Sequence, residues 1–238
     1  MGKVICIANQ KGGTAKTTTT VNLGIGLIKE GKKVLLIDAD PQGSLSASLG
    51  IGEPDSLKVT LSTILMNVVN EENIDPEEGI YHHEEGVDLL PGNIELSVME
   101  LTLANVISRE MILREYIEVQ RERYDYILID CMPSLGTLTI NALVAADSVL
   151  IPVQAAYLPV KGLQQLIKTI SMVKRRLNRR LMIEGVLLTM VDFRTNYAKD
   201  ISSKVRETYG TSIYGHCINC KVSNACKELT QEVLGNGR

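Results

Sequence analysis

The chain of 238 residues contains no tryptophan and only one phenylalanine, so its core has to be built from aliphatic side chains and methionine. It has five cysteines, an odd number, which argues against a framework of paired disulfides. No apolar run approaches membrane-spanning length, and the first residues have no apolar signal segment. These absences predict a cytoplasmic protein that does not act at a membrane.

The chain also lacks an excess of positive charge. Its 25 Lys and Arg residues are outnumbered by 28 Asp and Glu residues, which gives a formal net charge of −3. This balance excludes a uniformly basic nucleic-acid-binding protein, although it leaves room for a local basic surface. Hydrophobic residues make up 45% of the chain and charged residues 22%, as in ordinary globular proteins. The length suits one domain over residues 1–238.

Continuous apolar runs alternate with helical patterns along the chain. The predicted strands are Lys3–Ala8, Lys33–Asp38, Val87–Leu90, Tyr126–Asp130, Ser148–Val153 and Glu184–Met190. The predicted helices are Thr18–Lys29, Leu61–Val69, Leu96–Asn105, Glu110–Arg123, Leu138–Ala145, Gly162–Leu177, Ala198–Tyr209 and Ser223–Leu234. Continuous apolar strands are typical of a parallel sheet buried on both faces. The order predicts an α/β fold with a doubly wound, mostly parallel sheet flanked by helices.

The most informative segment is Asn9–Thr20, Asn-Gln-Lys-Gly-Gly-Thr-Ala-Lys-Thr-Thr-Thr-Thr, which joins a predicted strand to a predicted helix. Gly12 and Gly13 let the backbone curl so that successive N–H groups point at phosphate oxygens. The helix N-terminus adds the positive end of its dipole. Lys16 can reach the β- and γ-phosphates of a nucleoside triphosphate, and the Thr17 hydroxyl can complete the coordination of Mg²⁺.

A second lysine, Lys11, lies in the same loop on the far side of the phosphates from Lys16, so a second subunit's nucleotide is its natural target. ATP would then hold a homodimer together, and hydrolysis would loosen it. The predicted nucleotide-binding residues are Lys11, Gly12, Gly13, Thr14, Ala15, Lys16, Thr17 and Thr18.

Three aspartates follow predicted strands and are candidates for metal binding and hydrolysis. Asp130 ends an apolar strand and can hold Mg²⁺ through a bound water, since Mg²⁺ keeps part of its hydration shell. Asp38, at the end of the neighbouring strand, is a second metal candidate beside Thr17. Asp40, in the following turn, can reach the γ-phosphate and orient the attacking water. Aspartates at strand ends also serve as helix caps and turn formers, which is the alternative for each of them.

The loop resembles the deviant Walker A motif, Lys-Gly-Gly-x-x-Lys-Thr/Ser, of the ParA/MinD class of P-loop ATPases. The resemblance to ParA (Soj-type) partition ATPases also covers the blocks Asp38–Gly43, Asp130–Leu135, Ile151–Gln154 and Thr189–Thr195. It implies an ATP- and Mg²⁺-dependent DNA-segregation ATPase that forms a sandwich dimer, binds nucleoid DNA non-specifically and is reset when a ParB-type centromere-binding protein stimulates hydrolysis. It also implies that Asp40, together with Lys11 and Lys16, is catalytic.

The chain departs from this family at two places. Ala15 stands where the family has glycine before the lysine, and its methyl group is harmless only if the backbone there is near helical rather than at positive φ. Slow hydrolysis is expected of an ATP-dependent switch, and whether Ala15 impairs it further depends on which of these conformations the backbone adopts. Residues 211–238 form an atypical, shortened C-terminal segment, which lacks the family's Ile-Pro-Arg region. In the family that region helps to frame the base and carries DNA-contacting basic residues.

Two groups of basic residues are candidates for a DNA surface. The family carries part of its non-specific DNA surface where this chain has Arg194, Lys199, Lys204 and Arg206, so the resemblance implies salt-sensitive phosphate contacts there. The arginines between residues 175 and 180 crowd a helix end, where a solvated face that complements the helix dipole is an equally good explanation.

Two other functions remain open at this point. Cys217 and Cys220 form a Cys-x2-Cys pair near Cys226, which would suit an Fe–S cluster scaffold or carrier ATPase. A MinD-like positioning regulator is the other alternative, although such proteins normally end in a basic amphipathic helix. Residues 229–238 have few bulky apolar residues and do not favour it.

Overall fold

The computed structural model describes residues 1–154, 160–190, 213–214 and 222–235, whose strands form one sheet in the order β3-β4-β2-β5-β1-β6-β7-β8. The strands are β1 (Lys3–Ile7), β2 (Val34–Ala39), β3 (Tyr81–His82), β4 (Asp88–Leu90), β5 (Tyr126–Cys131), β6 (Ser148–Gln154), β7 (Met182–Thr189) and β8 (Ile213–Tyr214). All neighbours pair in parallel except β3, which runs antiparallel to β4. The predicted α/β fold with a mostly parallel sheet is confirmed.

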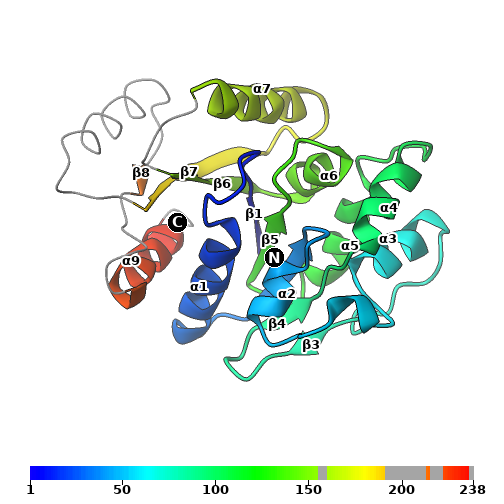
Figure 1. Ribbon diagram of the computed structural model, residues 1–238, viewed down its shortest axis with the longest axis horizontal. Helices are drawn as coiled ribbons and strands as arrows, with labels where there is room; N and C mark the ends of the chain where they lie inside the picture. Colours follow the sequence, from blue (N-terminus) through cyan, green and yellow to red (C-terminus); the bar gives the residue numbers. More distant parts are fainter. Residues whose placement is uncertain (155–159, 191–212, 215–221, 236–238) are drawn as a thin grey trace.

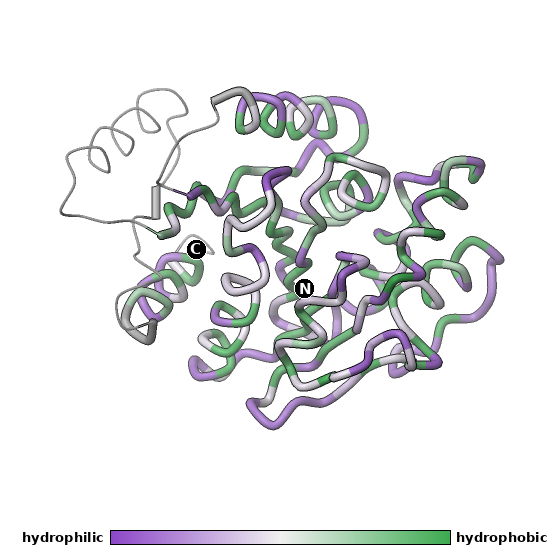
Figure 2. The backbone as a smooth tube through the Cα atoms, in the orientation of Figure 1, coloured by the Kyte–Doolittle hydropathy of each residue, from purple (hydrophilic) through white to green (hydrophobic). Residues whose placement is uncertain are grey.

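Helices cover both faces of this sheet (Figure 1). They are α1 (Lys16–Lys29), α2 (Ser44–Ser48), α3 (Leu61–Val69), α4 (Glu95–Leu103), α5 (Ile112–Gln120), α6 (Thr137–Ala145), α7 (Val160–Arg176) and α9 (Val222–Gly235), with a 3-10 turn at Pro54–Ser56. One hydrophobic cluster joins the sheet to α3, α4, α5, α6 and α7, and a second joins it to α1, α2 and α9. Figure 2 shows hydrophobic residues concentrated on the central strands and hydrophilic residues toward the periphery.

The predicted strands and helices that fall on described residues all occur, with ends within three residues of the expected positions. The sequence patterns missed α2, the 3-10 turn, β3 and β8, because elements of two to five residues are too short to show a hydrophobic period. The predicted helix over residues 198–209 lies outside the described residues.

The described residues after 210 contribute to the sheet and to its helical cover. β8 pairs in parallel with β7, with Val186 opposite Ile213. The predicted last helix occurs as α9 and buries Leu229 and Val233 against the cluster that contains α1. The two helices approach closely, because a Cβ built on Gly26 of α1 would lie 2.2 Å from the Thr230 hydroxyl oxygen. α9 therefore packs in the same helix layer as α1.

Candidate nucleotide site

The loop between β1 and α1 contains two residues in the left-handed region, Gly13 at φ 70° and Ala15 at φ 64° and ψ 34°. Glycine adopts this region without steric strain. In an alanine the Cβ approaches the following carbonyl oxygen, at a cost of roughly 1–2 kcal/mol. Of the two backbone conformations considered for Ala15, the structure has the strained one.

Hydrogen bonds tie this loop to the neighbouring strands. The Asn9 Nδ2 group donates to the Pro152 carbonyl at 2.6 Å, and the Asn9 Oδ1 atom accepts from the Lys11 amide at 3.0 Å. The Thr189 hydroxyl, at the end of β7, donates to the Thr14 carbonyl at 3.2 Å. Because the anchors come from β6 and β7 as well as from the loop itself, the curve of the loop is fixed by the sheet.

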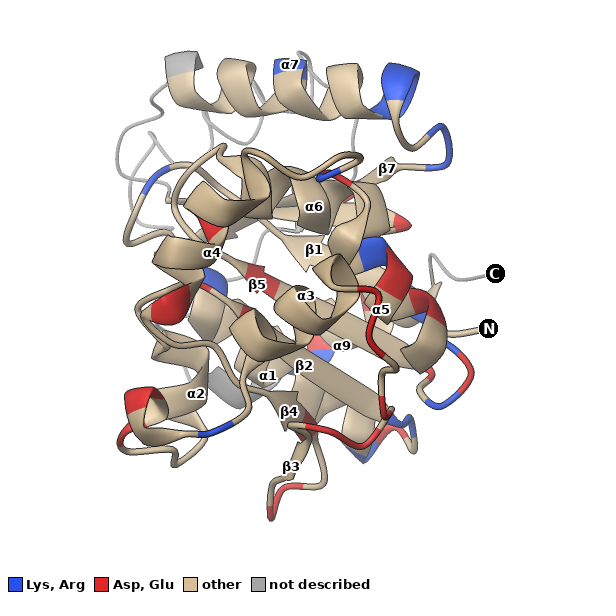
Figure 3. Cartoon of the chain, turned by 90° about the vertical axis from the view of Figure 1, so that its right-hand side faces the viewer, with Lys and Arg blue, Asp and Glu red and all other residues tan. Residues whose placement is uncertain are grey.

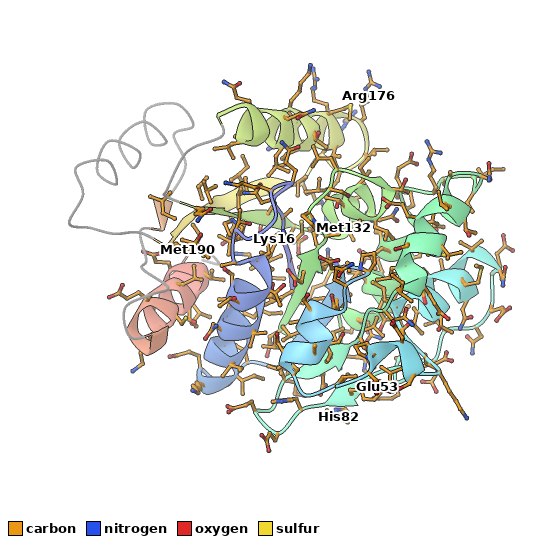
Figure 4. All side chains as sticks on the ribbon, in the orientation of Figure 1. Lys16, Glu53, His82, Met132, Arg176 and Met190 are labelled. Atoms are coloured by element: carbon orange, nitrogen blue, oxygen red, sulfur yellow. The ribbon has the colours of Figure 1, made fainter. Side chains whose placement is uncertain are left out.

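The two lysines of the loop have different environments. Lys16 is buried, with 7% of its surface exposed, and its Nζ atom donates to the Lys11 carbonyl at 3.5 Å. Lys11 is exposed. Figure 4 places Lys16 at the start of α1, near the middle of the molecule. One lysine is therefore enclosed by its own chain, whereas the other is open to solvent.

Asp130, the last residue but one of β5, lies next to the first turn of α1. The Thr17 hydroxyl donates to its Oδ2 atom at 2.6 Å, while its buried Oδ1 atom has no hydrogen-bond partner. Burial raises the pKa of Asp130 to about 7, although the bond from Thr17 works in the opposite direction. A buried carboxylate oxygen without a partner beside a hydroxyl oxygen is a donor set that Mg²⁺ prefers, so these residues fit that ion.

Asp38 is fully buried at the end of β2 and is held by Ser46. The Ser46 amide and hydroxyl both donate to Asp38 Oδ2, at 2.8 and 2.7 Å. Burial raises the pKa of Asp38 to about 6, against the lowering effect of these two bonds. Gly92 passes so close behind that a Cβ there would lie 2.3 Å from the Asp38 carbonyl oxygen. Neither Ser46 nor Gly92 was identified from the sequence, since both contacts depend on the folded arrangement.

Asp40 follows β2 and is half-buried. Its amide donates to Asp38 Oδ1 at 3.3 Å, and its own Oδ1 atom accepts from the Gln42 amide at 3.0 Å. The register of the sheet sets Asp38 opposite Asp130 on β5, and Asp130 opposite Ile7 at the end of β1. The three aspartates and the glycine-containing loop therefore meet at the carboxyl edge of the sheet, where polyphosphate and a divalent cation can be held together.

Within the described ranges, no three His, Cys, Asp or Glu side chains converge on a metal position. Mg²⁺ at this edge would consequently take its remaining ligands from phosphate oxygens and water. Cys217 and Cys220 lie outside the described residues, as do Arg194, Lys199, Lys204 and Arg206. No helix in the described part of the chain is both long enough and apolar enough to cross a bilayer.

Two cysteines of the central strands are buried in contact with each other. The Sγ atoms of Cys6 on β1 and Cys131 on β5 lie 3.7 Å apart, and both side chains are at most 1% exposed. The neighbouring Cys6 thiol, together with burial, raises the pKa of Cys131 well above its ordinary value. Both thiols therefore behave as small buried apolar groups.

Comparison with known proteins places the chain in a family. The family described as an AAA domain matches residues 2–183. The chain is 45% identical over 227 residues to the sporulation initiation inhibitor protein Soj of Bacillus subtilis, covering 94% of this chain and 88% of Soj. It is 42% identical over 227 residues to the chromosome partitioning protein ParA of Caulobacter vibrioides, covering 94% and 83%.

A solved structure shares the fold over the whole length of this chain. Cobyrinic acid a,c-diamide synthase from Mycobacterium smegmatis, determined with a bound ATP analogue and magnesium, superposes with a TM-score of 0.92 at 36% identity. The match covers 100% of this chain and 98% of that one. The loop, the strand-end aspartates and these similarities lead to one conclusion: the chain belongs to the ParA/Soj family of P-loop partition ATPases.

Proposed function

We propose that this chain segregates DNA as an ATP-dependent homodimer. It binds ATP and Mg²⁺ at the carboxyl edge of the sheet, attaches non-specifically to nucleoid DNA in the cytoplasm and is released when a ParB-type centromere-binding protein stimulates hydrolysis. The observation that carries the proposal is the contrast within one loop between a buried Lys16 and an exposed Lys11. The first serves the chain's own nucleotide, and the second serves a partner's.

The nucleotide is held mainly by the loop. Backbone N–H groups of the curled segment and the start of α1 face the phosphates, and the Lys16 ammonium group neutralises them. The nucleotide-binding set is Lys11, Gly12, Gly13, Thr14, Ala15, Lys16, Thr17 and Thr18. The solved ATP-analogue and magnesium complex of the cobyrinic acid a,c-diamide synthase supports these ligands.

Thr17 and Asp130 hold Mg²⁺, with Asp38 behind them. The hydroxyl of Thr17 already contacts Asp130, and the second carboxylate oxygen of Asp130 is unpartnered. Asp38 is fixed by Ser46 and adds negative charge at the same edge of the sheet. Bound Mg²⁺ neutralises charge on the phosphoryl oxygens.

Asp40 orients the water that attacks the γ-phosphate. Its carboxylate is positioned by the Gln42 amide, and its half-buried side chain keeps access to the site. Phosphoryl transfer depends mainly on positioning and charge neutralisation, so a carboxylate held by the backbone suits this role. Strain at Ala15, next to Lys16, makes slow turnover the expected behaviour.

DNA binding is assigned to cations that contact phosphates without reading bases. Arg194, Lys199, Lys204 and Arg206 are the proposed residues by family resemblance. Contacts of this kind release counterions, so affinity should fall steeply as salt rises and should not depend on sequence.

The dimer is tested by light scattering on size-exclusion fractions with and without ATP and Mg²⁺. The Asp40→Ala variant should accumulate as an ATP-bound dimer, because it binds but does not hydrolyse. Lys11→Ala in the same background should bind ATP and remain a monomer. An ATP-loaded Lys11→Ala variant that dimerises as well as its parent would remove the role proposed for Lys11.

A further inference from the structure

The end of α7 and the turn after it carry five cations within seven residues, Lys-Arg-Arg-Leu-Asn-Arg-Arg. The cationic residues are Lys174, Arg175, Arg176, Arg179 and Arg180, named here the α7 basic cluster, and all five are exposed. None of them forms an ion pair with another described residue. The cluster is therefore a positively charged patch on a chain whose net charge is −3.

The helix dipole accounts for only part of this cluster. Lys174, Arg175 and Arg176 lie in the last turn of α7, where cations interact favourably with the helix carbonyls. Of the three, Arg175 donates from Nε to the Ser171 carbonyl at 3.4 Å. Arg179 and Arg180 follow the end of the helix, so stabilisation of α7 does not explain them.

The turn that carries Arg179 and Arg180 is anchored by Asn178. This buried side chain donates from Nδ2 to three carbonyls around the end of α6, those of Leu143, Val144 and Ala146, at 3.2, 3.1 and 2.6 Å. Its Oδ1 atom accepts from the Arg180 amide at 3.2 Å. The backbone under both arginines is therefore fixed before any ligand arrives, which lowers the entropy lost on binding.

The cluster lies at the amino edge of the sheet, opposite the nucleotide site. The turn leads directly into β7, which begins at Met182, whereas the loop that carries Lys16 follows the carboxyl end of β1. Figure 3 shows the positively charged end of α7 on the same side of the molecule as the N-terminus. In Figure 4, Arg176 points away from the sheet. A surface at this edge stays open when a partner subunit covers the nucleotide edge.

We propose that the α7 basic cluster binds the phosphate backbone of double-stranded DNA, as a surface separate from residues 194–206. Four of its five cations are arginines, whose planar guanidinium groups form paired hydrogen bonds with phosphate oxygens. Residues 160–190 contain no aromatic side chain, so the bulky aromatic anchors typical of membrane-surface binding are missing. The inference rests on the proposed function, and adds to it a second contact face for the same polymer.

The test measures the binding of ATP-loaded protein to a labelled duplex of arbitrary sequence by fluorescence anisotropy over a series of salt concentrations. The cluster variant is Arg175→Gln/Arg176→Gln/Arg179→Gln/Arg180→Gln. The control, Lys29→Gln/Lys32→Gln/Lys33→Gln/Lys58→Gln, changes the net charge equally at other sites. Each lost phosphate contact lowers the log–log salt slope by roughly 0.9, so the cluster variant should lose about three to four units. The control should retain the parent slope, and both should bind ATP normally.

The outcomes separate this inference from the proposed function. If the parent binds DNA and the cluster variant matches the control, the inference is overturned while DNA binding by the family surface stands. If the parent ignores DNA even at low salt, both fail. If the cluster variant binds DNA normally but loses binding to vesicles of anionic phospholipid, the surface is a membrane contact and the inference is again overturned.

A smaller variant guards against misfolding. Arg179→Gln/Arg180→Gln leaves α7 and Asn178 unchanged, and should lower the salt slope by about two units. A parent-like slope in this folded variant would exclude the anchored turn from the DNA surface.

Discussion

The nucleotide site and the turn after α7, at opposite edges of the sheet, keep their charges in opposite ways. At the carboxyl edge Asp38, Asp130 and Lys16 are buried, and burial raises the pKa of both aspartates. At the amino edge, Arg179 and Arg180 are exposed on a fixed turn. A buried charge carries a desolvation penalty until a ligand of opposite charge neutralises it. An exposed charge stays hydrated and is screened by salt. The first arrangement suits one small ligand with its metal ion, and the second suits a polymer.

The largest expected effect comes from removing the buried lysine. Lys16→Ala deletes the ammonium group that faces the phosphates, and loss of charged hydrogen bonds in a buried site should weaken ATP binding by about 100-fold or more. Isothermal titration calorimetry measures this change. Lys11→Ala, from the same loop, removes only the contact to a partner's nucleotide, so its ATP affinity should fall far less than that of Lys16→Ala. Equal losses in the two variants would mean that burial does not distinguish the lysines.

Asp40→Ala should act on turnover rather than on binding. Removal of the group that positions the water should lower kcat by about 100-fold, while ATP affinity stays within a few-fold of the parent. A phosphate-release assay under saturating ATP checks the rate. The control is Glu84→Ala, which removes an exposed carboxylate that is distant from Asp40 in sequence, and it should hydrolyse ATP normally. Parent-like turnover in Asp40→Ala would make the catalytic assignment wrong.

Asp130→Asn should change the pH dependence of stability. Because the pKa of Asp130 is raised from 3.8 to about 7, the nucleotide-free folded state binds more protons than the unfolded state between these values. The contribution of Asp130 to the free energy of unfolding therefore falls as pH rises through this window. The variant should melt several degrees higher than the parent at pH above 7, since about 1 kcal/mol shifts Tm by roughly 2–4 °C in a domain of this size.

Thermal melts of parent and Asp130→Asn across the acidic and neutral range test this sign. The pH slope should shrink without vanishing, because burial also raises the pKa of Asp38. If the two proteins share the same slope, Asp130 is charged in the folded protein at low pH and the contrast between the two edges weakens.

Ala15→Gly should have the smallest effect on stability. Relief of the left-handed strain is partly offset by the greater freedom of glycine in the unfolded chain, which leaves a net gain of less than about 1 kcal/mol. Its effect on hydrolysis is more informative, because the strained residue adjoins Lys16. The ATPase rate and oligomeric state of both proteins should be measured side by side. A rate unchanged by the substitution would show that Ala15 does not limit turnover.

The fold was predictable because its strands are continuous apolar runs. β5, Tyr-Ile-Leu-Ile-Asp-Cys, is buried along its whole length and differs from its predicted range by one residue. β3 and α2 could not be predicted from the sequence, because their positions depend on pairing and packing with distant segments. Short elements therefore require the tertiary structure.

The site was partly predictable for a related reason. Lys16, Thr17, Asp38, Asp40 and Asp130 carry recognisable chemistry at the ends of strands, and parallel strands bring their ends to one edge. The residues that position Asp38 could not be predicted from the sequence. Ser46 reaches Asp38 from a five-residue helix, and Gly92 does so from a loop more than fifty residues away in sequence. The conformation of Ala15 was equally open, since the sequence allowed both alternatives.

The contact between Cys6 and Cys131 makes the sheet under the nucleotide loop accessible to a kinetic experiment. Both thiols are shielded from solvent, so a thiol reagent can modify them only when β1 and β5 open. The labelling rate of these two cysteines, resolved by peptide mass spectrometry, thus reports the opening free energy of the central strands. A ligand that binds only the closed form should slow labelling by the factor 1 + [L]/Kd. The chain in this way contains its own probe of nucleotide occupancy.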